Sequence, residues 1–183
     1  MSEHKKSQNK KKHKTMKFII HGGTLSRSLQ SISSVVPSGR TMPILLNFLM
    51  EVENEELKIT ASDLETTITV KLNPSMLEQD QVNKIAIPAK MFLEVVNSLS
   101  SQQITVEVKE NYSIEITAGT GRYKLVGEDP ASYPTAIELS DPALTTISSS
   151  VLVKAIGKTL FATGTGEMRP QMTGVLCEQT HNE

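Results

Sequence analysis

Two glycine-containing segments partly match phosphate-binding loops, but neither has the complete pattern. Gly157-Lys158-Thr159 matches the end of a P-loop, yet the glycine required five residues earlier is Leu152. Gly164-Thr165-Gly166 begins like a dinucleotide-binding fingerprint, yet Arg169 occupies the position of the third glycine. We therefore expect a helix at the first segment, an ordinary loop at the second, and no nucleotide cofactor.

Few residues could perform acid–base or metal chemistry. The four histidines are scattered along the chain: His4, His13, His21 and His181. Their spacing predicts no metal set and no activated serine. Asp63 and Glu65 stand close together, but after a strand a carboxylate usually accepts hydrogen bonds from the backbone amides of a turn. The sequence thus predicts a protein that is not an enzyme.

The charges are distributed unevenly along the 183 residues, although the net charge is only −1. Residues 1–16 carry six lysines and one acid, which leaves 13 basic and 19 acidic residues for the remainder. An acidic body of this kind should avoid nucleic acid unless its cations are gathered on one surface.

Helical wheels place cations on the polar faces of three predicted helices. These faces hold Arg27, Gln30, Ser31 and Ser34 in the first helix, Lys90, Glu94 and Asn97 in the second, and Lys154 and Lys158 in the third. Single surface lysines are usually only solvated, but three helices with four cations against one anion predict a mildly positive wall. Such a wall would attract the phosphates of duplex DNA without reading its bases.

The helices belong to a repeated unit. Residues 84–126 predict a strand, a helix over 89–98 and three further strands, because apolar residues recur at helical spacing in the helix and alternate in the strands. Residues 17–72 show the same order, with a helix capped by Thr24 after a Gly22-Gly23 turn, followed by a polar loop over 73–83. The fold class is therefore α+β, with strand-helix-strand-strand-strand units whose helices pack on an antiparallel sheet.

The expected domain organisation has three parts. Residues 1–15 form a disordered basic arm, either a phosphate-binding or targeting segment or a solvated tail. Residues 16–135 form the first domain, and 136–183 the incomplete start of a second. A third copy of the unit begins there, with a strand over 144–148, a helix capped by Ser149 or Ser150, and a strand over 172–178. Cys177 in that strand predicts a buried, reduced thiol and a cytoplasmic protein.

Several motifs resemble the bacterial sliding clamp, the beta subunit of the DNA polymerase III holoenzyme. They are Met16-Lys17-Phe18, Arg40-Thr41-Met42-Pro43-Ile44-Leu45, Ser62-Asp63-Leu64-Glu65, Ile87-Pro88-Ala89-Lys90, Tyr133-Pro134, and Arg169-Pro170 followed by Thr173-Gly174-Val175. The resemblance implies the DNA clamp fold and a processivity factor that encircles duplex DNA and tethers the replicative polymerase during DNA replication. It implies a homodimeric ring and a clamp loader as a further partner. The family is often catalogued under DNA-directed DNA polymerase, a nucleotidyltransferase (transferase) activity, although its clamp is not catalytic.

The resemblance also assigns roles to individual residues. Arg40 and Lys90 match DNA-contacting positions, and residues 164–171 match a DNA-contacting loop that includes Gly166, Pro170 and Gln171. Pro170 and Gln171 stand where some members carry tyrosines. Met172 would line the edge of the pocket for partner peptides. Arg122 to Leu125 match the strand used for dimer contacts.

One alternative remains at the level of sequence. A generic α+β interaction module, or an enzyme acting on a small ligand, could share the same architecture, because a fold does not determine a function. This alternative predicts a concave pocket into which polar groups converge.

Overall fold

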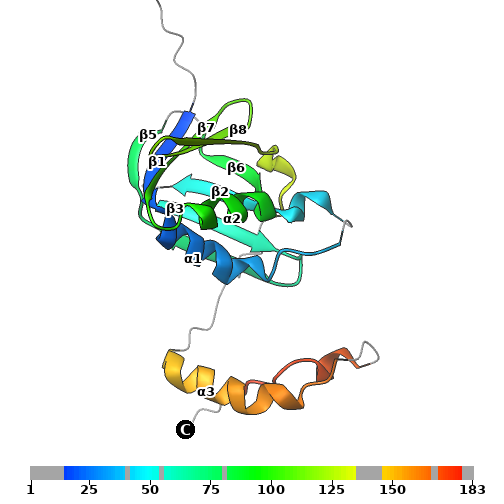
Figure 1. Ribbon diagram of the computed structural model, residues 1–183. Coiled ribbons are helices and arrows are strands. Elements are labelled where there is room, and N and C mark those ends of the chain that lie inside the picture. The colour runs from blue at the N-terminus through cyan, green and yellow to red at the C-terminus, as the bar shows by residue number, and fades with distance from the viewer. Residues whose placement is uncertain are drawn as a thin grey trace, which may run out of the picture. The chain divides into compact units, whose positions relative to one another are not determined.

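The computed structural model describes residues 15–39, 42–53, 56–79, 82–134, 146–165 and 169–178. By its internal contacts the chain divides into two compact units, Met1–Ala136 and Ile137–Glu183. Unit 1 contains two sheets and two helices, and the described part of unit 2 contains one α-helix (Figure 1).

The elements of unit 1 follow the repeated order predicted from the sequence. They are β1 Thr15–His21, α1 Gly22–Ser33, a 3₁₀ turn Pro43–Leu46, β2 Asn47–Glu53, β3 Glu56–Ser62, β4 Thr67–Leu72, β5 Ser75–Gln79, β6 Lys84–Pro88, α2 Ala89–Ser98, β7 Gln103–Lys109, β8 Ser113–Ala118, β9 Gly121–Val126 and a 3₁₀ turn Pro130–Ser132. The structure thus confirms the α+β class and both copies of the unit.

The two repeats exchange their first strands. One sheet has the order β4-β3-β2-β6 and the other β5-β1-β7-β8-β9. The first strand of repeat one, β1, pairs antiparallel with β7 of repeat two, so that Met16 faces Val108. The first strand of repeat two, β6, pairs antiparallel with β2, so that Ile87 faces Phe48. Neither sheet is complete without a strand from the other repeat, which makes unit 1 one interlocked body.

A single apolar core joins both sheets to both helices. Each helix contacts strands of both sheets: α1 touches β1, β3 and β4, and α2 touches β2, β6 and β9. Phe18, Phe48 and Phe92 are completely buried in this core. The apolar stripes of the helices, which include Leu25 and Val96, are buried as the helical spacing predicts. The two helices therefore lie side by side (Figure 1) with their polar faces turned away from the core.

Helix α1 begins earlier than predicted. Gly22 and Gly23 form its first turn, and the capping residue is His21, whose Nδ1 accepts a hydrogen bond from the Gly23 amide at 3.2 Å. The predictions that Gly22-Gly23 form a turn and that Thr24 caps the helix after it are therefore wrong. Gly22 lies so close to the chain after α2 that an added Cβ would be 2.1 Å from the Leu99 carbonyl oxygen. This glycine permits close packing rather than a turn.

Residues 73–83 are not simply a loop, because β5 lies within them. β5 pairs antiparallel with β1, with an irregularity in register between Lys17 and Phe18. Its partner β1 would otherwise present an edge of unpaired backbone groups. The pairing consists of backbone hydrogen bonds, which do not require an apolar pattern of side chains. The polar sequence of residues 73–83 therefore did not indicate a strand.

In unit 2, helix α3 spans Ser149–Thr159 and is followed by 3₁₀ turns at Leu160–Ala162 and Pro170–Met172. Its N-cap residue is Ser148, not Ser149 or Ser150. The predicted strand over 172–178 is wrong, since 173–178 are irregular, and Cys177 is exposed rather than buried. Residues 146–148 are not a strand either, and 144–145 lie outside the described residues. No described segment of unit 2 offers a strand for these residues to pair with.

Candidate nucleic-acid interface

The polar faces of α1 and α2 form one exposed surface, which we call the helix-pair face. Its residues are Arg27, Gln30, Ser31 and Ser34 from α1 with Lys90, Glu94 and Asn97 from α2, and all are exposed. The opposite sides of the same helices are buried in the core. The core therefore orients these seven side chains, because the apolar stripe of each helix leaves only one direction for its polar face.

A hydrogen-bonded contact joins the two helices. Ser26, which is 5% exposed, donates through Oγ to Asn97 Oδ1 at 2.5 Å. Gln30 Nε2 donates to the same oxygen at 3.1 Å and lies 3.3 Å from Ser26 Oγ. These bonds connect segments 71 and 67 residues apart in the chain. Helical wheels place Gln30 and Asn97 on polar faces, but the spacing within one helix cannot show that the two side chains meet.

The cations of the helix-pair face have no acidic partner among the described residues. Arg27 donates through Nε to the Gly23 carbonyl at 3.2 Å, one turn earlier in its own helix. Within the described ranges, neither Arg27 nor Lys90 forms an ion pair. Their charges are therefore available to an anion from outside the chain.

Cations on the strands have different surroundings. Five of them form ion pairs with carboxylates: Lys58 with Glu53, Lys71 with Glu56, Lys84 with Glu51, and Lys109 and Arg122 with Glu115. The shortest of these joins Lys58 Nζ to Glu53 Oε2 at 2.5 Å. Its hydrogen bond, and then the charges of the two groups, lower the pKa of Glu53 and raise the pKa of Lys58. The paired carboxylates neutralise these five cations. Lys17 on β1 and Lys124 on β9 form no ion pair within the described ranges, so the pairing applies to most of the strand cations but not to all of them.

The other predicted DNA-contacting residues are less completely placed. Arg40 and Gly166 lie outside the described residues. Lys154 and Lys158 are exposed on α3, four residues apart and so on one side of the helix. Pro170, Gln171 and Met172 form an exposed 3₁₀ turn, whose Met172 carbonyl accepts a hydrogen bond from the Gly164 amide at 2.8 Å. These five residues belong to unit 2.

The predicted dimer residues lie on β9, an edge strand of the five-stranded sheet. Arg122 is exposed, with Nε 2.9 Å from Glu115 Oε1, whereas Leu125 is 6% exposed and belongs to the core. Tyr123 and Val126 on the same strand are exposed, Val126 at 73%. The stretch taken from the resemblance, Arg122 to Leu125, includes Tyr123 but not Val126. Val126 is out of phase with the buried Leu125, and an apolar residue outside the alternation of a strand is a signal for an exposed apolar side chain.

Asp63 behaves as a turn-capping residue. Its Oδ1 accepts hydrogen bonds from the backbone amides of Glu65 and Thr66 at 3.0 and 2.6 Å. Leu64 between them has a φ of 82°, the left-handed conformation that such a turn requires. The carboxylate is therefore occupied by the backbone, as predicted, rather than paired with Glu65 for proton transfer.

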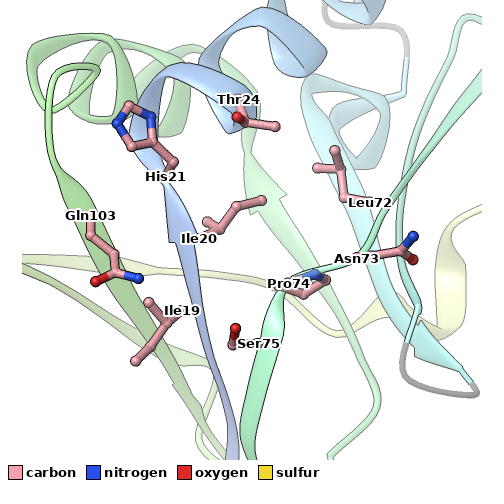
Figure 2. Close-up of a pocket in the computed structure, with 9 residues that line it drawn as sticks. All are labelled: Ile19, Ile20, His21, Thr24, Leu72, Asn73, Pro74, Ser75 and Gln103. Atoms are coloured by element: carbon pink, nitrogen blue, oxygen red, sulfur yellow. The ribbon is translucent and has the colours of Figure 1, made fainter.

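A shallow pocket lies where the end of β1, the start of α1 and the β4–β5 connection meet (Figure 2). Its volume is about 240 Å³, and it is lined by Ile19, Ile20, His21, Thr24, Leu72, Asn73, Pro74, Ser75 and Gln103. Figure 2 shows His21 and Ser75 on opposite sides, and His21 Nδ1 already accepts the Gly23 amide. No carboxylate, lysine or cysteine is among these lining residues. The polar side chains of the lining are those of His21, Thr24, Asn73, Ser75 and Gln103, so the pocket offers the small-ligand alternative neutral hydrogen-bonding groups but no carboxylate or lysine for an ionic ligand.

The described residues lack two other kinds of feature, a cluster of metal-ligating side chains and a membrane-spanning helix. Among the described residues, histidine, cysteine and acidic side chains form no group of three or more that could hold a metal ion. No helix in the described ranges is both long and apolar enough to cross a membrane.

Relatives of the chain agree with the architecture. The family described as DNA polymerase III beta subunit, N-terminal domain, matches residues 16–137. The beta sliding clamp of Halalkalibacterium halodurans is 30% identical over 165 residues, which are 87% of this chain and 43% of that protein. The Staphylococcus epidermidis beta sliding clamp is 27% identical over 165 residues, 87% of this chain and 44% of that protein.

Solved structures show the same likeness. The DNA polymerase sliding clamp of Bacillus subtilis superposes with a TM-score of 0.77 at 28% identity, covering 86% of this chain and 42% of that one. The Pseudomonas aeruginosa sliding clamp bound to griselimycin gives a TM-score of 0.76 at 27% identity, covering 86% of this chain and 42% of that one. The chain thus spans less than half the length of these relatives. With the family match over residues 16–137 and two interlocked repeats of the same order, the chain belongs to the DNA polymerase III beta subunit family.

Proposed function

We propose that this chain supplies the N-terminal part of a sliding clamp, a processivity factor that encircles duplex DNA and tethers the replicative polymerase during replication. The family match and the beta sliding clamps among its relatives support the proposal. In this role the protein holds a polymerase near its template and performs no nucleotide transfer itself. It acts in the cytoplasm, with the polymerase and a clamp loader as its protein partners.

One observation of the structure carries the proposal: both cations of the helix-pair face, Arg27 and Lys90, lack an acidic partner among the residues that the structure describes, whereas five of the seven cations on its strands are paired. A surface with few, exposed cations attracts the phosphates of any duplex sequence and releases counterions on contact. Such contacts are screened by salt and individually weak, so the protein can move along the duplex. Closure of a ring then prevents escape, and loose binding is sufficient.

Other residues of the chain are proposed to make further contacts. Arg40 and the loop residues Gly166, Pro170 and Gln171 would contact DNA, together with Lys154 and Lys158 on α3. Met172 would lie at the edge of the pocket for partner peptides. In the homodimeric ring, the edge strand β9 would meet the partner through Arg122, and Leu125 would support that strand from the core. We keep residues 16–135 and 136–183 as the proposed domain division.

The test compares two double variants of equal charge change. Arg27→Gln with Lys90→Gln removes the cations of the helix-pair face, and Lys71→Gln with Lys84→Gln removes two paired strand cations. Binding of the full chain to two labelled duplexes of unrelated sequence is measured by fluorescence anisotropy at several salt concentrations.

We expect the helix-face variant to bind both duplexes more weakly and to lower the salt slope, log K against log salt, by about two. The strand variant should bind like the wild type. Equal losses in the two variants, or a loss confined to one duplex sequence, would contradict the proposed function.

A further inference from the structure

The contact between α1 and α2 orients one side-chain amide on the helix-pair face. Asn97 Oδ1 accepts two hydrogen bonds, from Ser26 Oγ at 2.5 Å and from Gln30 Nε2 at 3.1 Å. A carbonyl oxygen of this kind has two lone pairs, so both are in use. The orientation of the planar amide is therefore determined by two donors on the neighbouring helix.

The other end of the Asn97 amide is a group with two N–H donors. Among the hydrogen bonds of the described residues, none uses Asn97 Nδ2, and the residue is exposed. Asn47 offers a contrast, because it is 2% exposed and its Nδ2 donates to the Ile44 carbonyl at 3.1 Å. Asn97 thus presents an oriented, solvent-facing donor, whereas Asn47 uses its donor inside the protein.

This donor lies on the same exposed face as the two cations. On α2, Asn97 follows Lys90 by seven residues, on the same face and about 10 Å further along the axis. On α1, Gln30 follows Arg27 by three residues, one turn away. A phosphate strand that contacts Lys90 and follows α2 would therefore pass Asn97, beside the turn of α1 that carries Ser26 and Gln30.

We propose that the Asn97 side-chain amide donates a hydrogen bond to a phosphate oxygen of duplex DNA, with Ser26 and Gln30 as the residues that position it. The inference rests on the proposed function and deepens it by adding a non-ionic contact. A neutral amide displaces no counterion, so its contribution to affinity is independent of salt, unlike that of Arg27 or Lys90. Glu94, on the same face between Lys90 and Asn97, opposes phosphate binding and keeps the contact weak.

The first experiment compares Asn97→Ala with Asn111→Ala in the full chain. Asn111 is also exposed, but it lies in the β7–β8 turn, where its Oδ1 accepts the Ser113 amide at 3.2 Å. We expect Asn97→Ala to weaken duplex binding on the order of three- to tenfold at every salt concentration, without changing the salt slope. Asn111→Ala should bind like the wild type.

The second experiment requires no variant to fold. In nitrogen-15 NMR spectra of the wild-type chain, the side-chain amide signal of Asn97 should shift as duplex DNA is added, while that of Asn47 should stay in place. A third experiment tests the positioning residues: Ser26→Ala, which removes one of the two orienting donors, should weaken binding less than Asn97→Ala does.

The outcomes separate this inference from the proposed function. If the wild-type chain binds duplex DNA but Asn97→Ala binds equally well, or if the Asn97 amide signal does not move, the inference is wrong and the clamp function stands. If the wild-type chain binds no duplex even at low salt, the proposed function fails and the inference fails with it.

Discussion

The lysines and arginines of this protein differ in whether a carboxylate lies within ion-pair distance. Lys71 and Lys84 on the strands face Glu56 and Glu51 at 3.8 and 2.6 Å. Within the described part of the chain, the one hydrogen bond of the Arg27 side chain goes to the Gly23 carbonyl of its own helix. The strand pairs lie across neighbouring strands: Lys84 is directly opposite Glu51, and Lys71 is diagonal to Glu56. Helix α1 contains no acidic residue and offers Arg27 no such partner. The same residue types can therefore stabilise a sheet in one place and remain available to phosphates in another.

At this scale we predict a pH dependence for the pair of Glu53 and Lys58. The pKa of Glu53 is lowered from 4.5, so the pair stabilises the folded chain above pH 4.5 and loses this effect as pH falls through the lower folded-state pKa. The pKa of Lys58 is raised from 10.5, so the effect is also lost as pH rises through that higher value.

The measurement is urea unfolding of the wild type and Glu53→Gln across pH. Because Glu53 is exposed and Lys58 only half-buried, the difference at neutral pH should be small and should shrink at high salt. It should disappear in strong acid. A difference that persists below the folded-state pKa of Glu53 would show that the substitution acts through something other than the ion pair.

At the scale of the element, the start of α1 depends on two residues that do not match the usual sequence pattern for a helix start. His21 supplies the capping acceptor through Nδ1, and Gly22 lets the first turn approach the chain after α2, where its amide donates to the Gln102 carbonyl at 2.9 Å. Thr24 is a favoured capping type, but it lies inside the helix. Tertiary packing, rather than capping preference, thus decides where α1 begins.

We predict that His21→Ala lowers the free energy of unfolding by about 1 kcal/mol, since the Gly23 amide loses its acceptor. Thr24→Ala serves as the matched control and should change stability little. Both are measured by urea unfolding followed by circular dichroism. A larger loss for Thr24→Ala than for His21→Ala would contradict this assignment of the cap.

Two glycines in helices should respond oppositely to alanine. At Gly22 an added Cβ would be 2.1 Å from the Leu99 carbonyl oxygen, so Gly22→Ala forces backbone apart and should destabilise unit 1 by more than about 2 kcal/mol. At Gly157 in α3, no heavy atom lies within 4 Å of an added Cβ.

Gly157→Ala should therefore increase the helicity of α3 and stabilise that helix by about 1 kcal/mol. Thermal unfolding of both variants, followed by circular dichroism, provides the comparison. Equal effects of the two substitutions would contradict the close contact at Gly22.

At the scale of the whole molecule, unit 1 is joined by the exchange of β1 and β6 between its repeats. Each sheet needs one strand from the other repeat, so neither repeat can unfold alone without opening both sheets. The described part of unit 2 differs in that its apolar side chains are largely exposed. Val153, Phe161 and Leu176 are 70%, 85% and 87% exposed there, which leaves α3 without a closed apolar core.

We predict that limited proteolysis cuts the chain first within residues 146–178 and leaves a resistant body containing residues 15–134. Open segments with few buried contacts are cleaved from locally unfolded states, whereas the interlocked core must open as a whole. Gel electrophoresis with mass spectrometry identifies the products. Equal resistance of the two regions would show that unit 2 is as well packed as unit 1.

The sequence by itself determined the order of elements in both repeats and the face that each turns to the core. Ile104, Val106 and Val108 alternate with polar residues in the sequence, and all three are fully buried. Phe92 and Val96 are four residues apart, the spacing of one helix face, and both are also fully buried. Such patterns are local: one segment shows which of its own sides is apolar. The polar face that carries Lys90 follows directly from this, as does the turn closed by Asp63.

Only the tertiary structure decided which segments meet. The exchange of β1 and β6, the pairing of β5 with β1, and the bonds from Ser26 and Gln30 to Asn97 join residues far apart in the chain. Backbone hydrogen bonds do not depend on the type of side chain, so the sequence of a strand does not show which other strand it pairs with. Residues 173–178 illustrate the converse, because a strand-like sequence stays irregular where no described strand is available to pair with it.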